Sequence, residues 1–171
     1  MKIEKLTARD MTDIALVAAI YVALTLTPPL NAISFGAIQF RLSEMLNFLA
    51  FYNRKYIIGV TIGCMISNLI GFGIVDLFVG GLSTLVFVTL GVMLFERYQK
   101  DYLLGGLVNK AFLYFSLFFS ASMFTIALEL KVLYDLPFFT TWLTTAGGEL
   151  LSLLIGAVII DKLSKHIDLK R

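Results

Sequence analysis

The chain has 171 residues, of which 58% are apolar and 15% are charged, with a formal net charge of +2 and a mean hydropathy of +0.87. So few charged residues cannot solvate a water-soluble domain of this size, and the small positive charge does not indicate nucleic-acid binding. We therefore predict an all-α membrane protein with lipid as its main solvent and no nucleic acid among its partners.

Six segments are predicted to form membrane helices, since a span needs about 20 residues, or about 17 where neighbouring helices cover its ends. They are Met11–Thr27, Leu42–Tyr52, Tyr56–Val75, Leu77–Phe95, Ala111–Leu128 with an apolar lead-in from Tyr102, and Phe138–Ile160. The first two are marginal because they contain Asp13 and Glu44, and the second is short. We interpret the first as a membrane helix rather than a secretory signal, because no small-x-small cleavage site follows it.

The positions of Lys and Arg predict the orientation of the chain, because short cytoplasmic loops are enriched in both. Most of them lie at the two ends of the chain and in the second-to-third and fourth-to-fifth turns: Lys2, Lys5, Arg9, Arg54, Lys55, Arg97, Lys100, Lys162, Lys165, Lys170 and Arg171. The opposite loops hold only Arg41 and Lys131. Both termini are therefore predicted to be cytoplasmic.

The outer connection between the first two spans, residues 28–41, is too long for a tight turn and is rich in Pro, Asn, Ser, Gly and Gln. We expect it to fold over the helices as a lid that opens to admit a ligand.

Three alanines of the first span, Ala15, Ala19 and Ala23, recur every four residues and therefore lie on one face of a helix. A flat strip of small side chains lets another helix approach closely. Two interpretations remain open at this point: packing inside the protein, or docking of a partner's helix.

A polar cluster stands where the outer loop enters the second span. Arg41 and Glu44 are three residues apart, with Gln39 just before them. An ionisable group at membrane depth costs several kcal/mol unless it is paired or faces water. The cluster is therefore either an Arg–Glu ion pair or the mouth of a binding pocket.

Glu149 lies near the middle of the last span, directly after Gly147 and Gly148, with no basic residue within a helical turn. Lys110 is expected to extend to the cytoplasmic surface instead of pairing with it. We therefore expect the Glu149 carboxylate to accept hydrogen bonds from a ligand, with the glycines allowing a close approach.

Asn68, Asp76 and Trp142 complete the set of candidate binding residues, at the outer parts of the third and sixth spans. Together they would line a polar, aromatic pocket near the outer leaflet. Trp142 also fits an interfacial aromatic belt, and Asp76 also fits a helix cap.

The sequence lacks the motifs that several kinds of chemistry require. It has no phosphate-binding Gly-x-x-x-x-Gly-Lys-Ser/Thr loop and no His-Glu-x-x-His motif, and Cys64 and His166 are its single cysteine and histidine. We predict neither an enzyme nor a metal or cofactor site.

The segment Ala15-Leu16-Val17-Ala18-Ala19 matches the Ala-x-x-x-Ala feature in the first helix of the S components of energy-coupling factor (ECF) transporters. Within that family, the stretch Ser34-Phe35-Gly36-Ala37-Ile38-Gln39-Phe40-Arg41-Leu42-Ser43-Glu44 is most similar to the QueT subfamily of queuosine-precursor transporters. The resemblance covers essentially the whole chain.

This resemblance implies a six-helix subunit of the bacterial cytoplasmic membrane that binds a 7-deazaguanine-type base, such as a prequeuosine base or queuine. Its implied partner is the ECF energising module, a transmembrane coupling subunit with two ATPases. A guanine-like edge has two adjacent N–H donors, which either Glu149 or Glu44 would accept. Gln39 or Asn68 would meet the ring carbonyl, and Trp142 or a phenylalanine would stack on the base.

Three alternatives remain. The chain would instead be an S component for riboflavin, thiamine or a folate, or a self-sufficient secondary carrier, although such carriers often show inverted repeats that we do not find. A purely structural membrane subunit would leave Glu149 and Arg41 unexplained.

Overall fold

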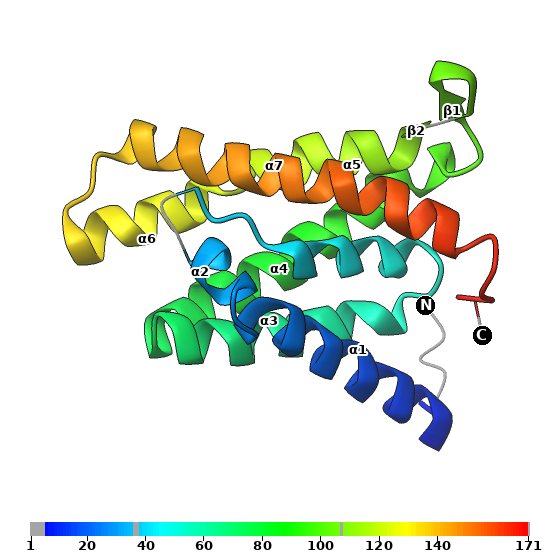
Figure 1. Ribbon diagram of the computed structural model, residues 1–171, viewed down its shortest axis with the longest axis horizontal. Coiled ribbons are helices and arrows are strands. Elements are labelled where there is room, and N and C mark those ends of the chain that lie inside the picture. The colour runs from blue at the N-terminus through cyan, green and yellow to red at the C-terminus, as the bar shows by residue number, and fades with distance from the viewer. Residues whose placement is uncertain (1–5, 36–37, 107, 171) are drawn as a thin grey trace.

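The computed structural model of the protein describes residues 6–35, 38–106 and 108–170 (Figure 1). Its elements are α1 (Ala8–Leu26), α2 (Leu30–Ser34), the 3₁₀-helix η1 (Leu42–Phe51), α3 (Lys55–Gly71), α4 (Ile74–Phe95), η2 (Glu96–Tyr98), β1 (Tyr102–Leu103), η3 (Leu104–Gly106), β2 (Val108–Asn109), α5 (Lys110–Ala121), α6 (Phe124–Tyr134) and α7 (Phe138–Leu163). The described chain is almost entirely helical, which confirms the predicted all-α class.

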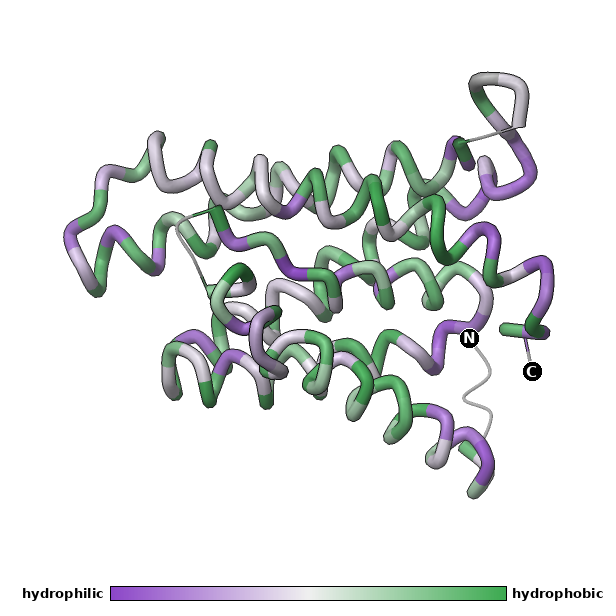
Figure 2. Tube along the Cα trace, viewed as in Figure 1, coloured by the Kyte–Doolittle hydropathy of each residue, from purple (hydrophilic) through white to green (hydrophobic). Residues whose placement is uncertain are grey.

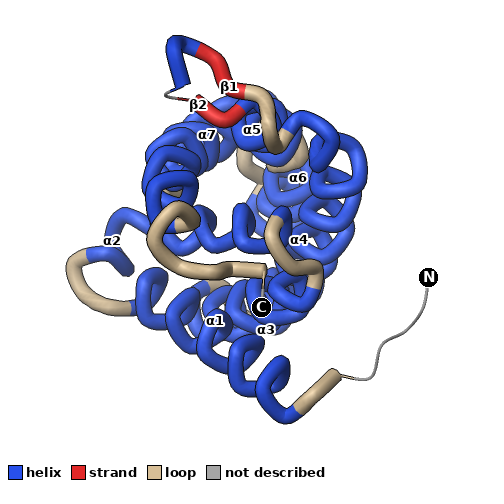
Figure 3. The backbone as a smooth tube through the Cα atoms, turned by 90° about the vertical axis from the view of Figure 1, so that its right-hand side faces the viewer, coloured by secondary structure: helices blue, strands red, loops and turns tan. Residues whose placement is uncertain are grey.

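The long helices run roughly parallel to one another, so they are seen end-on when the molecule is viewed along its long axis (Figure 3). α1 begins and α7 ends at the same end of the molecule (Figure 1). In the described part of the chain, three helical segments are long and apolar enough to cross a membrane alone: Ile74–Tyr98, Lys110–Tyr134 and Phe138–Leu163. The six-span arrangement with cytoplasmic termini stays a prediction.

The second predicted span is helical, but η1 is a 3₁₀-helix. Ten residues cover about 20 Å in this form, compared with about 15 Å in an α-helix. Most of η1 is buried, and it packs against α1, α3, α4 and α7. Because its neighbours cover it, this short segment contributes polar side chains to the interior of the bundle without facing lipid.

Two glycines of α7 explain how η1 and the segment before it lie directly against that helix. A Cβ added at Gly156 would lie 2.3 Å from the Cβ of Met45, and one at Gly148 would lie 1.7 Å from the carbonyl oxygen of Ile38. Both distances are too short for any side chain. The close approach predicted beside Glu149 is therefore made by the outer segment at Gly148, whereas Gly147 faces open space among the described residues.

α1 packs on α3 through two further glycines. A Cβ at Gly59 would lie 2.9 Å from the carbonyl oxygen of Ile14, and one at Gly63 would lie 2.6 Å from the Cβ of Tyr21. α1 therefore buries the face that holds Ile14, Val17, Ala18, Tyr21 and Thr25. The strip of Ala15, Ala19 and Ala23 is left on the outside of the bundle.

The fifth predicted span, Ala111–Leu128, differs from the structure at both ends and in the middle. The apolar lead-in from Tyr102 is a β-hairpin of β1 and β2, and the helical segment extends to Tyr134. A break separates α5 from α6, where the Ser122 hydroxyl donates to the carbonyl oxygen of Phe119 at 2.6 Å. Serine hydroxyls that bond to backbone carbonyls compete with the helical ladder and favour such breaks.

The break frees the carbonyl of Ala121, and the indole Nε1–H of Trp142 donates to that oxygen at 2.9 Å. An unpaired backbone carbonyl in an apolar setting costs several kcal/mol. Trp142 therefore joins α7 to the α5–α6 junction.

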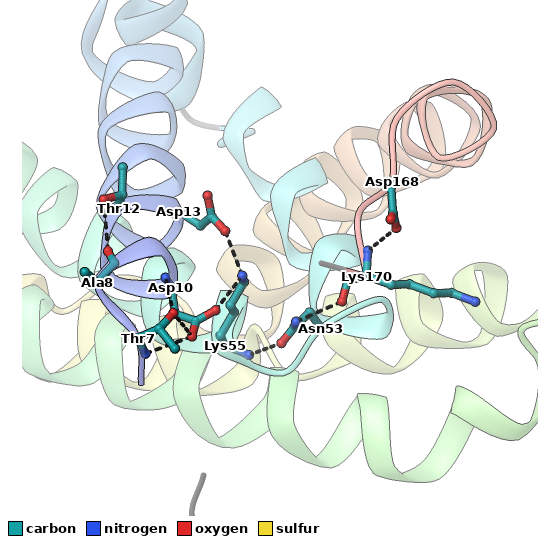
Figure 4. Close-up of polar contacts among 9 residues, drawn as sticks. All are labelled: Thr7, Ala8, Asp10, Thr12, Asp13, Asn53, Lys55, Asp168 and Lys170. Carbon is teal, nitrogen blue, oxygen red and sulfur yellow. Dashed lines mark hydrogen bonds and ion pairs between the residues drawn. The ribbon is translucent and has the colours of Figure 1, made fainter. Parts of the chain in front are cut away.

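Polar residues gather at the end of the bundle where α1 begins and α7 ends (Figure 2). Thr7 and Asp10 form a capping box at the start of α1. The Lys55 ammonium lies between Asp10 and Asp13, at 2.8 and 2.7 Å from their oxygens (Figure 4). Nearby, the Asn53 side chain donates to the carbonyl oxygen of Lys170, which fixes the C-terminal tail against the turn after η1. These contacts hold α1, α3 and the tail together at one end.

Candidate functional site

Arg41 lies just before η1 and is buried, with 8% of its surface exposed. Its Nη1 donates to Oδ1 of Asn68 at 2.8 Å, its Nε donates to the carbonyl oxygen of Ser34 at 3.3 Å, and its guanidinium lies 5.2 Å from the Phe35 ring centre. No carboxylate of the described residues lies within 4.0 Å of it. A guanidinium held inside the bundle without an ion pair is available to an acceptor on a ligand.

Glu44 does not form the direct ion pair with Arg41 that one interpretation of the sequence predicted. Its Oε1 accepts a hydrogen bond from the Tyr21 hydroxyl and its Oε2 accepts one from the Asn47 amide at 2.7 Å. Arg41 has an extended backbone outside the helix, so its side chain diverges from that of Glu44 despite the three-residue spacing. Glu44 thus joins α1 to η1, and both of its carboxylate oxygens already accept hydrogen bonds from side chains of the protein.

Glu149 is different, because its Oε1 has no hydrogen-bond partner among the described residues although only 3% of the residue is exposed. Lys110 is not its partner, since the ammonium of Lys110 lies against the rings of Tyr98 and Tyr114. Buried polar groups are nearly always hydrogen-bonded, so an unpaired carboxylate oxygen indicates a place for a donor that comes from outside the chain.

Asn68 links Arg41 to a second group of acidic residues. Its Nδ2 donates to the backbone carbonyl of Asp76 at 3.4 Å. The carboxyl group of Asp76 in turn contacts that of Glu129 on α6. Both residues are buried, and each has one carboxyl oxygen without a partner in the described structure.

Two neighbouring cavities share the side chain of Gln39. The inner cavity has a volume of about 20 Å³, enough for roughly one water molecule, and polar groups of Arg41, Glu44, Asn68 and Glu149 line it. The outer vestibule has a volume of about 600 Å³, and it is lined by Phe35, Gln39, Phe72, Leu130, Tyr134, Leu136, Thr140, Thr141, Thr144 and Thr145. The vestibule matches the size of ligand pockets, and Gln39 stands between it and the charged groups.

The structure thus brings five of the seven predicted binding residues to the inner cavity: Gln39, Arg41, Glu44, Asn68 and Glu149. Asp76 lies one turn outside the cavity-lining Gly80. Trp142 is not among the residues that line either cavity, so the arrangement offers Phe35, Phe72 and Tyr134 as stacking partners instead. Residues 36 and 37 of the predicted lid lie outside the described residues.

Sequence reasoning missed Glu129, because the fifth span was taken to end at Leu128. The signal was present, since Glu129 stands between Leu128 and Leu130 in an apolar run, as Glu149 does in its own helix. Tyr21 was also missed. A tyrosine in an apolar helix gives no sign of its partner until α1 is placed beside η1.

The alanine strip lines an apolar groove of about 720 Å³ between α1 and α3. Ala15, Ala19 and Ala23 are exposed, and Ile58, Ile62 and Ile66 of α3 form the other wall. The strip therefore does not serve packing inside the described bundle.

The family model for the QueT transporter matches residues 11–165. The chain belongs to the QueT transporter family. This confirms the resemblance found in the sequence, and QueT proteins are a family of transporters rather than of enzymes. The queuosine precursor transporter QueT of Lactococcus lactis subsp. cremoris (strain MG1363) is 64% identical over 162 residues, which cover 95% of this chain and 96% of that protein. No solved structure matches the chain.

Membership of the QueT family, together with three helices able to span a bilayer, makes this chain a membrane protein of the transporter class. The matched residues include the whole inner cavity, both walls of the alanine groove and the vestibule.

Proposed function

We propose that the chain is the substrate-binding S component of an ECF-type importer, and that it captures a queuosine precursor with a 7-deazaguanine base beside Arg41 and Glu149. The observation that carries this proposal is the unpaired Oε1 of Glu149, which lines the same inner cavity as the Arg41 guanidinium. The name of the Lactococcus relative supports the substrate class.

The hydrogen-bonding groups of the cavity complement those of a guanine-like edge. Such an edge has two adjacent N–H donors next to a carbonyl acceptor. Glu149 supplies the acceptors, and Arg41 or Gln39 supplies the donor for the ring carbonyl. Glu44 is the weaker candidate for reading the base, because Tyr21 and Asn47 already donate to its two oxygens.

Substrate binding in this account requires movement of the outer segment. The inner cavity is too small for a bicyclic base, whereas the vestibule is large enough. Gln39 stands at the boundary with a left-handed backbone, φ +48°, a conformation that is uncommon for non-glycine residues. We infer that the base first stacks in the vestibule and that displacement of Gln39 opens the way to Arg41 and Glu149.

The groove beside the alanine strip supports the second half of the proposal, the energising partner. Its walls are almost wholly apolar and its floor consists of small side chains, which suits a helix of another membrane subunit. We assign this groove to the transmembrane coupling subunit, whose two ATPases would drive release of the substrate inside.

Identification of the bound ligand tests the proposal. The chain is purified from cells that make queuosine precursors, and the extracted ligand is identified by mass spectrometry. A 7-deazaguanine supports the proposal, whereas riboflavin, thiamine or a folate would assign the chain to another substrate. Uptake by the chain alone in liposomes, without coupling subunit or ATPases, would contradict the S-component role and favour a secondary carrier.

A further inference from the structure

The pair formed by Asp76 and Glu129 lies beside the inner cavity and has no assigned role. Asp76 is one helical turn from Gly80 on α4, and Glu129 is close to Ile126 on α6. Gly80 and Ile126 both line the inner cavity. Leu130 of α6 lines the vestibule. Glu129 itself lines a lateral groove between α4 and α6, and Ser83 lines both this groove and the inner cavity, so the two carboxyl groups lie between the inner cavity and the groove.

The two carboxyl groups contact each other and are poorly exposed, at 5% and 7% of the residue surface for Asp76 and Glu129. Apart from this contact, Oδ2 of Asp76 and Oε2 of Glu129 have no hydrogen-bond partner in the described part of the chain. Two carboxylates in contact repel each other unless a proton or a cation lies between them. The pair therefore holds a shared proton in the free protein, and a protonated amine of a ligand would take the place of that proton.

The number of carboxyl groups near the inner cavity also favours a cationic ligand. Glu44 and Glu149 line the inner cavity together with Arg41, and Asp76 and Glu129 are buried next to it, so this region has four buried carboxyl groups and one guanidinium among the described residues. Glu149 has its own unpaired oxygen on the cavity. The site as a whole thus has more acceptor oxygens than a neutral base would use.

We propose that Asp76 and Glu129 form a cation subsite that binds a protonated amine carried by the substrate, while Arg41 and Glu149 bind its base. This inference rests on the proposed function. An amine on a short arm of the base would place its three N–H donors between the two carboxyl groups, and the Asn68 amide next to Asp76 holds that side of the subsite in position.

If the subsite exists, the protein should prefer a ligand with an amine over the same base without one. The residues that bind the base would not by themselves produce this preference. Two ligands are compared by calorimetric titration of the purified chain in lipid nanodiscs: 7-deazaguanine with an aminomethyl group, which is a cation at neutral pH, and the same ring with a nitrile, which is neutral. The wild type is expected to bind the amine roughly tenfold to a hundredfold more tightly, the range of a charge-assisted hydrogen bond.

Glu129→Gln is expected to remove most of this preference, with a far smaller change for the nitrile, and Asp76→Asn provides a second variant should the first not fold. Glu149→Gln is expected to weaken binding of both ligands to the same extent. Glu96→Gln is the matched control: Glu96 is a surface residue paired with Arg54, and this variant is expected to keep the wild-type preference for the amine. Three results would overturn the subsite. The wild type would show no preference for the amine, both subsite variants would keep the wild-type preference, or both variants would weaken binding of the two ligands equally. Binding of neither ligand by the wild type would overturn the proposed function itself.

Discussion

Nη1 of Arg41 donates to Oδ1 of Asn68 at 2.8 Å, so the side chain nearest to this buried guanidinium is a neutral amide and not a carboxylate. The amide fixes the direction of the guanidinium without neutralising its charge. The positive charge thus remains for a ligand, while Glu149 keeps an unpaired oxygen on the same cavity.

Asn68→Leu is expected to destabilise the protein and to weaken ligand binding. The variant leaves a buried guanidinium N–H without an acceptor, which costs about 1–3 kcal/mol. Thermal unfolding in detergent and titration with a 7-deazaguanine measure the two effects. Thr89→Ala is the comparison, because it removes only a hydroxyl that donates to the carbonyl oxygen of Leu85, and Thr89 lines neither the inner cavity nor the vestibule. Equal effects of the two substitutions would contradict the role of Asn68.

Gly148→Ala is expected to weaken binding and to lower stability by about 1–3 kcal/mol, because its Cβ would lie 1.7 Å from the Ile38 carbonyl and displace the outer segment from α7. Gly147→Ala is the matched control one residue away. Gly147 has open space around it, so alanine there is expected to be neutral or stabilising by up to about 1 kcal/mol. Hydrogen exchange of residues 38–41 in both variants checks the displacement, and unaltered exchange in Gly148→Ala would speak against it.

Ala19→Trp is expected to abolish association with the coupling subunit and to stop uptake, while ligand affinity stays within about twofold. The substituted side chain fills the groove between α1 and α3 but is remote from the inner cavity. Val86→Trp on the exposed face of α4 controls for a bulky residue at the lipid surface. Co-purification with the energising module measures association. Loss of ligand binding in parallel with uptake would show that the strip matters for the fold instead.

The orientation in the membrane gives a further prediction. In a chain where Cys64 is replaced by alanine, a cysteine at Asn31 or Lys131 is expected to react with an impermeant reagent added outside. Asn31 is in α2 and Lys131 is in the last turn of α6, and both elements lie toward the end opposite to the start of α1 (Figure 1). A reporter fused after Arg171 should read cytoplasmic. Labelling of those cysteines from the inside alone would reverse the orientation.

The sequence predicted those parts of the site that stand out against an apolar background. Glu149, Arg41 and Glu44 were recognised because a charged group inside a hydrophobic run has no local partner. The same reasoning failed at Glu129, since the apolar residues after Leu128 were taken for a loop.

Pairings across the bundle were beyond sequence reasoning. Arg41 with Asn68 and Tyr21 with Glu44 join residues that are 27 and 23 positions apart, and only the packing of η1 between α1 and α3 brings them together. The spacing of Arg41 and Glu44 suggested a direct pair, but the extended backbone before η1 turns the two side chains apart. Trp142 suited a stacking role by composition, whereas its partner is a carbonyl freed by the helix break.

The two carboxylates at the inner cavity are expected to behave in opposite ways when each is replaced by glutamine. Glu149→Gln should fold at least as well as the wild type, because its Oε1 accepts no hydrogen bond from any described residue, so the substitution breaks none there. Glu44→Gln should unfold more easily, because the amide has one acceptor oxygen where the carboxylate has two, and both Tyr21 and Asn47 donate to that carboxylate.

The most direct test of the account is a calorimetric titration of the wild type and Glu149→Gln with a 7-deazaguanine ligand, together with thermal unfolding of both. The account predicts submillimolar or tighter binding by the wild type, and a loss of roughly tenfold to a hundredfold in affinity for Glu149→Gln at unchanged or raised stability. Normal binding by Glu149→Gln combined with a lower unfolding temperature would contradict it, and would make Glu149 a structural residue of α7.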